Sequence, residues 1–215
     1  MCARPANPEL RAEILKAATR IIEGCGPDCV TMRQVAEEVG YSATTLYLYF
    51  KDKDAILSEV ILCGFDDLAD FCNMSAVGPS AVDVLRQRAR AYITWGQMHP
   101  SIYTLMFETR VDVEWSPEDQ QRATRSGFDG WRAMDEAIAA GELTGISDPT
   151  GFGVAMWAAT HGVTSLANSR RLSAEAATAS PGEVLAQAIS VGDVLVSGLL
   201  SPHLAKPKRP ASRRP

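Results

Sequence analysis

Hydroxyl-bearing side chains are concentrated in one stretch of the chain, the run SATTLYLY at residues 42–49. Hydroxyl groups, together with the free N–H groups at the start of a helix, can bind phosphate without making a segment basic. Lys51 and Lys53 follow this run and add positive charge beside it. These residue types favour a surface that binds phosphate groups through geometry more than through bulk charge.

The residues around this run predict two short helices joined by a tight turn. Thr31 is a good N-cap, Gln34 stands three residues later as in a capping box, and Gly40 ends the first helix. Ser42 caps the second helix, residues 43–49, whose apolar side chains share one side. A helix-turn-helix is the direct interpretation, and the second helix of that motif enters the major groove of DNA.

The rest of the chain also has helical periodicity, and no segment shows a convincing alternation of the kind found in strands. We expect further helices at residues 8–24, 53–72, 81–98, 101–109, 117–140, 149–170 and 181–200. The predicted fold is all-α, with a three-helix N-terminal domain joined by a fourth helix to a helical C-terminal domain. The predicted division is a flexible N-terminus at 1–9, a helix-turn-helix domain at 10–54, a C-terminal domain at 55–201 and a disordered basic tail at 202–215.

The charge distribution limits how the chain can bind nucleic acid. Hydrophobic residues make up 46% of the 215 residues, enough for a buried core, and the formal net charge is -5. Five of the 21 Lys and Arg residues lie in the last ten positions, so the remaining 16 face 26 acidic residues and the body carries about -10. Such an acidic body excludes binding by bulk charge alone. The tail either contacts DNA phosphates or, as we favour, only aids solubility.

The cysteines and the uncharged segments bear on where the chain works. Five cysteines without a Cys-x-x-Cys pair favour reduced thiols. Cys25 and Cys29 could form a thiol switch, although nearby cysteines at a helix end are more often inert. The longest uncharged stretch, residues 149–169, contains too many polar side chains for a membrane-spanning helix, and residues 1–9 show no signal-peptide pattern. We therefore expect a cytoplasmic protein.

At the helix-turn-helix the sequence resembles the tetracycline-repressor (TetR) family of bacterial transcription regulators. The resemblance covers the first quarter of the chain, and its pieces occur in order and at the family's spacing. Around Cys25 and Gly26 the chain departs from the family's usual Gly-aromatic-x-x-x-Thr pattern. The residues that carry the resemblance are Ile14, Leu15, Ala17, Ala18, Gly26, Thr31–Ala36, Gly40–Ser42, Thr45–Tyr47, Tyr49, Phe50, Lys53 and Leu57.

The resemblance implies that residues 43–49 enter the major groove of double-stranded operator DNA. It assigns contacts with base edges to Thr44 and Thr45. Packing against the first helix is the alternative role for Tyr47, and helix capping is the more common role for Ser42. The other expected DNA-binding residues, mostly through phosphates, are Thr31, Arg33, Ser42, Ala43, Tyr47, Tyr49, Lys51 and Lys53.

The last predicted helix, residues 181–200, is apolar on most sides, with strongly polar residues only at Glu183, Gln187 and Asp193. Such a helix needs burial on two sides, which favours contact with a second copy of the chain. The resemblance likewise implies a homodimer in which the last two helices of each copy form a four-helix bundle. The expected interface residues are Val184, Ala188, Val191 and Leu195.

Two later segments resemble the C-terminal domain of one TetR subgroup, AYITWGQMHPSIYTLMF at residues 91–107 and the Trp157-x-x-x-His161-Gly162 element. This resemblance implies a regulatory domain, in which a small hydrophobic effector would occupy an apolar pocket. Core packing is the alternative for every candidate, and His161 is better explained as a structural histidine. The candidate effector-binding residues are Trp95, Met98, Tyr103, Phe107, Trp131, Trp157 and His161.

These observations favour a DNA-binding transcriptional regulator that is not an enzyme, uses no cofactor and acts as a repressor released by its effector. A ligand-dependent activator, or an architectural protein that ignores small molecules, needs the same helices. An all-α enzyme that uses the same cavity is a further alternative. The sequence argues against it, because it contains no Gly-x-Ser-x-Gly elbow, no His-Glu-x-x-His helix and no phosphate-binding loop. A metal sensor would need clustered ligands, whereas His99, His161, His203 and the cysteines are scattered.

Overall fold

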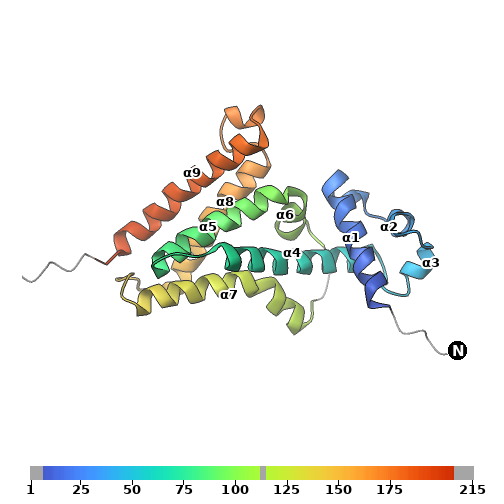
Figure 1. The fold of residues 1–215 in the computed structure, drawn as a ribbon, viewed down its shortest axis with the longest axis horizontal. Coiled ribbons are helices and arrows are strands. Elements are labelled where there is room, and N and C mark those ends of the chain that lie inside the picture. The colour runs from blue at the N-terminus through green and yellow to red at the C-terminus, as the bar shows by residue number, and fades with distance from the viewer. Residues whose placement is uncertain (1–6, 112–114, 206–215) are drawn as a thin grey trace, which may run out of the picture. The chain divides into compact units, whose positions relative to one another are not determined.

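The computed structural model describes residues 7–111 and 115–205, including the side chains of all of them except Ser126 and Phe128. The described chain is all-α, as predicted: it has no β-strand, and one isolated bridge joins Leu143 to Leu204 (Figure 1). The helices are α1 (Pro8–Cys25), α2 (Met32–Val39), α3 (Ala43–Leu46), α4 (Lys53–Ser75), α5 (Ala81–Met98), α6 (Pro100–Phe107), α7 (Pro117–Ala139), α8 (Pro149–Asn168) and α9 (Pro181–Leu200). Short 3₁₀ turns are η1 (Pro27–Cys29), η2 (Glu175–Ala177) and η3 (Ser201–His203).

The chain divides into two compact units. The first unit comprises the residues up to Phe71 together with Trp95–Ser126, and the second comprises Cys72–Thr94 and the residues from Gly127 on. Helices α4, α5 and α7 therefore each contribute residues to both units. The helix-turn-helix segment lies wholly within the first unit, and the domain boundary at residue 54 stays a prediction.

The helix-turn-helix of the first unit is supported by α1. Asn7 caps this helix by accepting a hydrogen bond from the Glu9 N–H, and Pro8 occupies the first helical position. Helix α1 packs on α2, and α2 packs on α3. Their shared core holds α3 on a rigid base and consists of Leu10, Ile14, Ala17, Ala18, Ile22, Val30, Val35, Ala36, Leu46 and Phe50.

The turn between α2 and α3 depends on Gly40. Its backbone is left-handed, with φ 73° and ψ 27°, and its N–H donates to the carbonyl groups of Ala36 and Glu37. Only glycine adopts this conformation at little cost, because a Cβ atom would crowd the following carbonyl. Gly40 therefore sets the direction in which the chain enters α3.

We expect Gly40→Ala to lower the free energy of unfolding by about 1 to 2 kcal/mol, the cost of a left-handed alanine. Gly24→Ala is the matched control, because Gly24 lies in α1 with open space where a Cβ would be added. That substitution should be neutral or stabilise by about 0.5 kcal/mol. Urea denaturation measures both, and equal effects of the two substitutions would contradict this explanation of the turn.

A chain of ion pairs in the first unit links α1, α4 and α7. Glu59 of α4 accepts hydrogen bonds from Arg11 of α1 at 3.1 Å and from Arg122 of α7 at 3.3 Å. Arg122 also donates to Asp66 at 2.7 Å. Burial alone would lower the pKa of Arg122, but its hydrogen bonds to Asp66 and Glu59 outweigh burial and raise it. Glu59 of α4 therefore forms ion pairs with both α1 and α7.

Glu59→Gln is expected to destabilise the protein by about 1 to 2 kcal/mol, because two guanidinium groups lose a charged partner that is about four-fifths shielded from solvent. Glu13→Gln, a change at an exposed carboxylate of α1, should stay within about 0.5 kcal/mol of the parent protein. Thermal unfolding at two salt concentrations measures both. A Glu59→Gln effect no larger than that of Glu13→Gln would show that the ion pairs do not hold these helices together.

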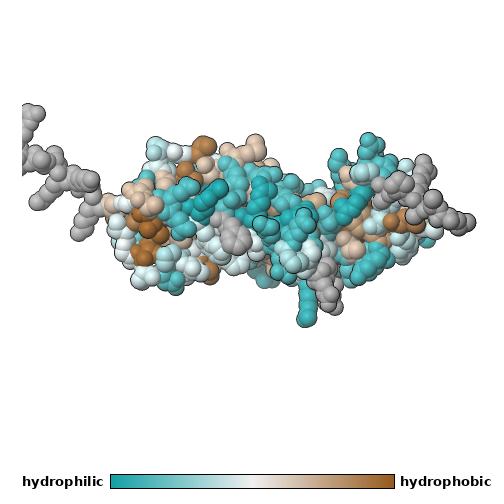
Figure 2. Space-filling model, turned by 90° about the horizontal axis from the view of Figure 1, so that it is seen from below, coloured by the Kyte–Doolittle hydropathy of each residue, from teal (hydrophilic) through white to brown (hydrophobic). Residues whose placement is uncertain are grey.

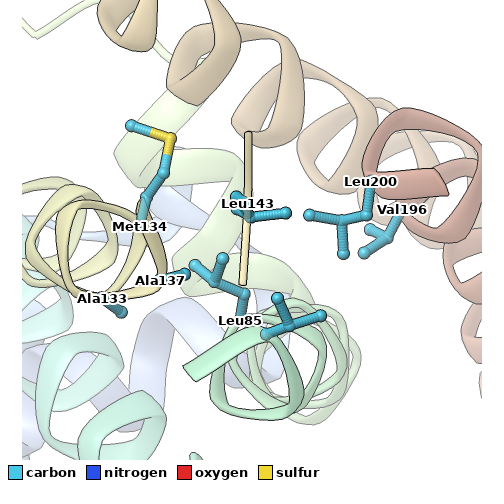
Figure 3. Close-up of a cluster of buried hydrophobic side chains, with 8 residues drawn as sticks. Leu85, Ala133, Met134, Ala137, Leu143, Val196 and Leu200 are labelled. Atoms are coloured by element: carbon cyan, nitrogen blue, oxygen red, sulfur yellow. The ribbon is translucent and has the colours of Figure 1, made fainter. Parts of the chain in front are cut away.

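The second unit is built around two buried clusters. One brings together α5, α7, α9 and the segment after α7; Figure 3 shows Leu143 in its middle, pointing toward Val196 and Leu200 of α9. The other brings α8 and α9 together through Val163, Ala167, Val184 and Ala188, with Ile93 of α5 and Ala176 of η2. Helix α9 is thus held along its whole length by its own chain.

The structure corrects three boundaries expected from the sequence. Residues 7–9 were assigned to a flexible N-terminus, but they form the cap and first turn of α1. Residues 202–205 were assigned to the disordered tail, but His203 and Ala205 make backbone hydrogen bonds with Thr144 and Glu142. The second helix of the motif is α-helical only at Ala43–Leu46 and then tightens into turns. The rest of the basic tail and residues 112–114 of the expected acidic loop lie outside the described residues.

Candidate DNA-binding site

The start of α3 is organised by Ser42, which caps the helix as expected. Its hydroxyl accepts a hydrogen bond from the Thr45 N–H at 3.1 Å and lies 2.9 Å from the Thr45 hydroxyl. Thr45 is half-buried, while Thr44 is exposed. Of the two threonines predicted to read base edges, Thr44 presents the freer surface, and Thr45 shares its hydroxyl with the cap. Ala43 is half-buried beside them.

The two tyrosines of the motif occupy different environments. Tyr47 is 55% exposed. Tyr49 is half-buried, and its phenol oxygen accepts a hydrogen bond from the backbone N–H of Asn7 at 3.1 Å. The packing role that we considered for Tyr47 therefore belongs to Tyr49, which ties the end of the motif to the start of α1. Tyr47 is the tyrosine whose ring is available to a DNA backbone.

The positively charged residues near α3 are only partly neutralised. The side chain of Lys51 is 83% exposed, with Asp52 3.8 Å away, and Lys53 is the half-buried first residue of α4. The side chain of Arg33 is 87% exposed and donates to Glu37 at 2.8 Å, a hydrogen bond that raises the pKa of Arg33. A phosphate contact by Arg33 therefore has to compete with Glu37.

Thr31 is exposed, and its side chain also caps α2. Its hydroxyl caps α2 by accepting from the Gln34 N–H at 3.1 Å, and it also donates to the Gln34 side chain. Thr31 is thus the N-cap that the sequence predicted. The pair is not a full capping box, because the Gln34 side chain accepts from the Thr31 hydroxyl and not from the Thr31 backbone N–H. A phosphate contact by Thr31 would add to this cap.

Two exposed apolar residues near α3 were missed by the sequence analysis. Leu48 is 77% exposed and Tyr41 is 49% exposed. The signal for Leu48 was present in the spacing: Leu46 and Phe50 are four residues apart and both buried, so the residue midway between them points away. An apolar side chain at this surface can contact a sugar or a thymine methyl group.

The candidate effector residues fall into two groups, one in each unit. In the first unit Trp95 and Tyr103 are buried, Met98 is 57% exposed, and the rings of Tyr103 and Phe107 are 4.8 Å apart. Phe65 and Trp115, which the sequence analysis did not single out, extend this aromatic cluster, with Phe65 5.4 Å from Phe107 and 6.4 Å from Trp115.

In the second unit the rings of Trp157 and His161 are 5.3 Å apart, and His161 Nδ1 lies 3.3 Å from the hydroxyl of buried Tyr92. This hydrogen bond supports the structural role expected for His161. Trp131 packs over Gly153 of α8, where no side chain intervenes. Trp157 is 47% exposed, so part of its side chain is accessible to a ligand or to another chain.

The residues expected at the dimer interface are not equally available. Val184 is 2% exposed and Ala188 is fully buried, because both pack against α8 and α5 of the same chain. Val191 is half-buried, and Leu195 is 42% exposed. The exposed residues Val194, Val154 and Leu166 were not among the expected ones. Within one chain, Val184 and Ala188 therefore cannot supply the contact surface expected of them.

Cys25 and Cys29 are joined by a disulfide between the end of α1 and η1. The expectation of reduced thiols is wrong for this pair, because the short connection folds the two sulfur atoms against one another. Cys63 and Cys72 are free, and burial raises the pKa of both thiols, that of Cys72 to about 11. Among the described residues no group of three or more His, Cys, Asp and Glu side chains is arranged to hold a metal ion.

Among the described helices one stretch, Pro181–His203, is long and apolar enough to cross a membrane, with a mean hydropathy of 1.7. Length and composition alone support that possibility, and core helices of soluble proteins meet the same criteria. Asp193 lies within this stretch and forms a bidentate ion pair with Arg90 at 2.7 and 2.8 Å. A solvent-accessible ion pair of this kind favours a helix in water.

Two family models match the chain. Residues 14–60 match the model of bacterial regulatory proteins of the tetR family, and residues 85–191 match a tetracyclin repressor-like C-terminal domain. HTH-type transcriptional regulator Rv1816 of Mycobacterium tuberculosis is 26% identical over 145 residues, which cover 66% of this chain and 61% of that protein. YfiR of Bacillus subtilis, an uncharacterized HTH-type transcriptional regulator, is 37% identical over 57 residues, 26% of this chain and 28% of its own.

Solved structures share the fold. A protein of unknown function from Rhodococcus sp. RHA1 superimposes with a TM-score of 0.74 at 24% identity, covering 92% of this chain and all of the other. The TetR family transcriptional regulator PfmR from Thermus thermophilus superimposes with a TM-score of 0.62 at 17% identity, covering 90% of this chain and 99% of the other.

The helix-turn-helix on its α1 base and the helical C-terminal part define a DNA-binding transcriptional regulator. The two matching models together cover well over half of the residues, and the chain belongs to the TetR family. The aligned part spans about 61% of the length of the mycobacterial relatives, so this similarity does not identify the operator, the effector or the partners of the whole protein.

Proposed function

We propose that this protein is a cytoplasmic, homodimeric repressor that binds a palindromic operator and is released when a small hydrophobic molecule binds its C-terminal part. The observation that carries the proposal is the exposed surface of α3. There Thr44 of α3, and Tyr47 and Leu48 of the turns that follow it, face solvent, while Leu46 and Phe50 of the same segment are buried in the core with α1 and α2. A rigid, mostly uncharged reading surface suits an acidic protein that must recognise DNA by shape and hydrogen bonds.

The proposed DNA contacts follow from the exposure of each side chain. Thr44 and Thr45 would meet base edges, and Tyr47, Lys51, Lys53, Arg33 and Thr31 would meet phosphates and sugars. The Tyr49 hydroxyl already accepts from Asn7, so its role is to position the start of α1 beside the groove. Two such surfaces need half-sites about one helical turn, roughly 34 to 36 Å, apart.

The proposed dimer uses the surface that α8 and α9 leave open. Every fourth residue of α9, from Val184 through Ala188, Gly192 and Val196 to Leu200, is buried in its own chain. The other sides expose Val194 and Leu195, and α8 exposes Val154, Trp157 and Leu166. Figure 2 shows one face of the molecule, on which small hydrophobic patches interrupt a largely hydrophilic surface. A second copy of the chain that covers these residues would explain why α8 and α9 carry apolar side chains on the sides that are exposed in a single chain.

The route of release that we propose runs through α4. Glu59 and Asp66 of this helix hold Arg122 of α7, and Glu59 also holds Arg11 of α1. A ligand that shifts α4 or α7 would therefore pull on the base of the helix-turn-helix. The ligand must prefer the released state by about 1 to 3 kcal/mol for a 5- to 150-fold effect, and operator DNA must then weaken ligand binding by the same factor.

The test is a gel shift of the purified protein on the DNA upstream of its own gene, at one stated salt concentration, with and without a panel of hydrophobic compounds. A sharp shift that one compound reverses would support the repressor. A shift that appears only with a compound would favour an activator. Absence of binding to upstream DNA with and without compounds would count against the operator assignment.

A further inference from the structure

The connection between α1 and α2 brings two cysteines together. Cys25 is the last residue of α1, Cys29 is the last residue of η1, and their Cα atoms are 6.1 Å apart. This separation lies within the range of about 4.4 to 6.8 Å that native disulfides span. The separation of the two Cα atoms is therefore compatible with a disulfide between Cys25 and Cys29.

The same backbone also accommodates the two cysteines as thiols. The Cys25 sulfur lies 3.4 Å from the carbonyl oxygen of Ile21, and the Cys29 sulfur lies 3.1 Å from the carbonyl oxygen of Cys25. On reduction the two sulfur atoms must move apart, and these carbonyl oxygens are the nearby acceptors for the S–H groups that form. The reduced state therefore has hydrogen-bond acceptors close to both sulfur atoms.

Cys25 is exposed, unlike the other described cysteines. Cys29 is half-buried. Cys63 is half-buried and Cys72 is buried, and burial raises the pKa of both thiols, so that little thiolate forms. An oxidant in solution would meet Cys25 first.

A regulator that acts on bacterial DNA works in the cytoplasm, where thiol systems keep most cysteines reduced. Disulfides found there are usually transient and catalytic or redox-sensing. We propose that Cys25 and Cys29 are a reversible dithiol–disulfide switch that sets the affinity of the helix-turn-helix for DNA. Its effect rests on the operator binding proposed above, whereas its chemistry does not.

The oxidant is a low-molecular-weight disulfide. The Cys25 thiolate attacks one of its sulfur atoms, the S–S bond of the oxidant breaks, and one small thiolate leaves. The Cys29 thiolate then attacks the Cys25 sulfur of the mixed disulfide and expels the second small thiolate. The protein pair loses two electrons and two protons, the oxidant becomes two thiols, and a reducing dithiol reverses both steps.

Oxidation should stiffen the path from α1 to α2. The backbone of this path is held by the hydrogen bonds of Gly26 to Ile22, Cys29 to Gly26 and Val30 to Pro27, and the side chain of Val30 at its end is buried. The cap of α2, Thr31, follows directly. A covalent link between Cys25 and Cys29 restricts the conformations that this five-residue segment can adopt in the free protein. If the reduced segment loses the same conformational entropy only when the protein binds DNA, oxidation raises the affinity for DNA by at most about 30-fold. The oxidised form should bind more tightly.

The chemistry is tested with protein carrying Cys2→Ser, equilibrated with reduced and oxidised glutathione, and then alkylated and weighed by mass spectrometry. We expect two alkylation sites to disappear on oxidation without a glutathione adduct, and to return with dithiothreitol. Cys63→Ser is the matched control and should behave in the same way, whereas Cys25→Ser and Cys29→Ser should form at most a glutathione adduct. Retention of all thiols under oxidising conditions, or their loss in both single variants, would overturn the proposal.

The effect is tested by gel shifts of the oxidised and reduced protein on the DNA upstream of its gene. Tighter binding by the oxidised form, absent in Cys25→Ser, supports the switch, and equal binding or tighter binding by the reduced form overturns it. If neither form binds DNA, the operator proposal fails, and hydrogen exchange at residues 26–34 decides on the switch. Faster exchange in the reduced form then supports it, and equal exchange overturns it.

Discussion

Protein carrying Val194→Glu is expected to be monomeric at concentrations where the parent protein is dimeric. Val194 of α9 is 70% exposed in one chain, and the proposed interface would bury it against a second copy. A carboxylate buried there without a partner costs roughly 3 kcal/mol or more, which raises the dimer dissociation constant at least about 100-fold. Leu195→Glu should act in the same direction. Operator affinity should fall with the dimer, because each half-site would be bound alone.

Sedimentation or light scattering measures this effect, and Val77→Glu is the matched control. Val77 is 72% exposed in the connection between α4 and α5, so the same change of side chain is made at the same exposure. The control should leave both the dimer and its stability unchanged. A full dimer in both α9 variants would place the interface elsewhere, and dissociation of the control would show that the effect is one of general charge.

Thr44→Ala is expected to weaken binding to the operator by about 1 to 3 kcal/mol, roughly 5- to 150-fold, while binding to unrelated DNA changes little. The reason is that an exposed hydroxyl on the reading side of α3 is lost. The free energy of unfolding should stay within about 0.5 kcal/mol, since the side chain supports nothing in the free protein. Thr45→Ala should also weaken binding, but it removes the contact with Ser42 and so should disturb the cap.

The measurement is a titration of operator and unrelated DNA at one salt concentration, with Thr124→Ala of α7 as the control. Thr124 is an exposed threonine in a helix away from the motif, and its replacement should leave both affinities unchanged. Operator affinity that Thr44→Ala leaves intact would refute the placement of α3 in the groove. An equal loss on both DNAs would assign Thr44 to the backbone instead of the bases.

Helix boundaries were predictable wherever capping residues stood next to a regular apolar pattern. Helix α9 occupies the expected residues 181–200, because Ser180 and Glu183 form a capping box and Pro181 fits the first turn. The burial of Leu46 and Phe50 followed in the same way from their spacing. These features are local, and a single sequence carries all the information they need.

The roles of particular side chains were less predictable where the local pattern was ambiguous. Tyr47 and Tyr49 differ in sequence only by position, and the tightening of the chain after Leu46 decides which ring turns back to α1. On α9, apolar residues occur on nearly every side, so periodicity could not tell that Val184 and Ala188 face the same chain. The disulfide depends on how η1 folds back on α1, which no periodic pattern records.

The bond between the Tyr49 hydroxyl and the Asn7 N–H has a practical consequence for handling the protein. It fixes the point at which the polypeptide enters α1, beside the turns that follow α3. An affinity tag fused ahead of Asn7 would therefore emerge next to the reading surface, where a histidine-rich or acidic peptide competes with or repels DNA. Binding constants are therefore best measured with the amino terminus left unmodified.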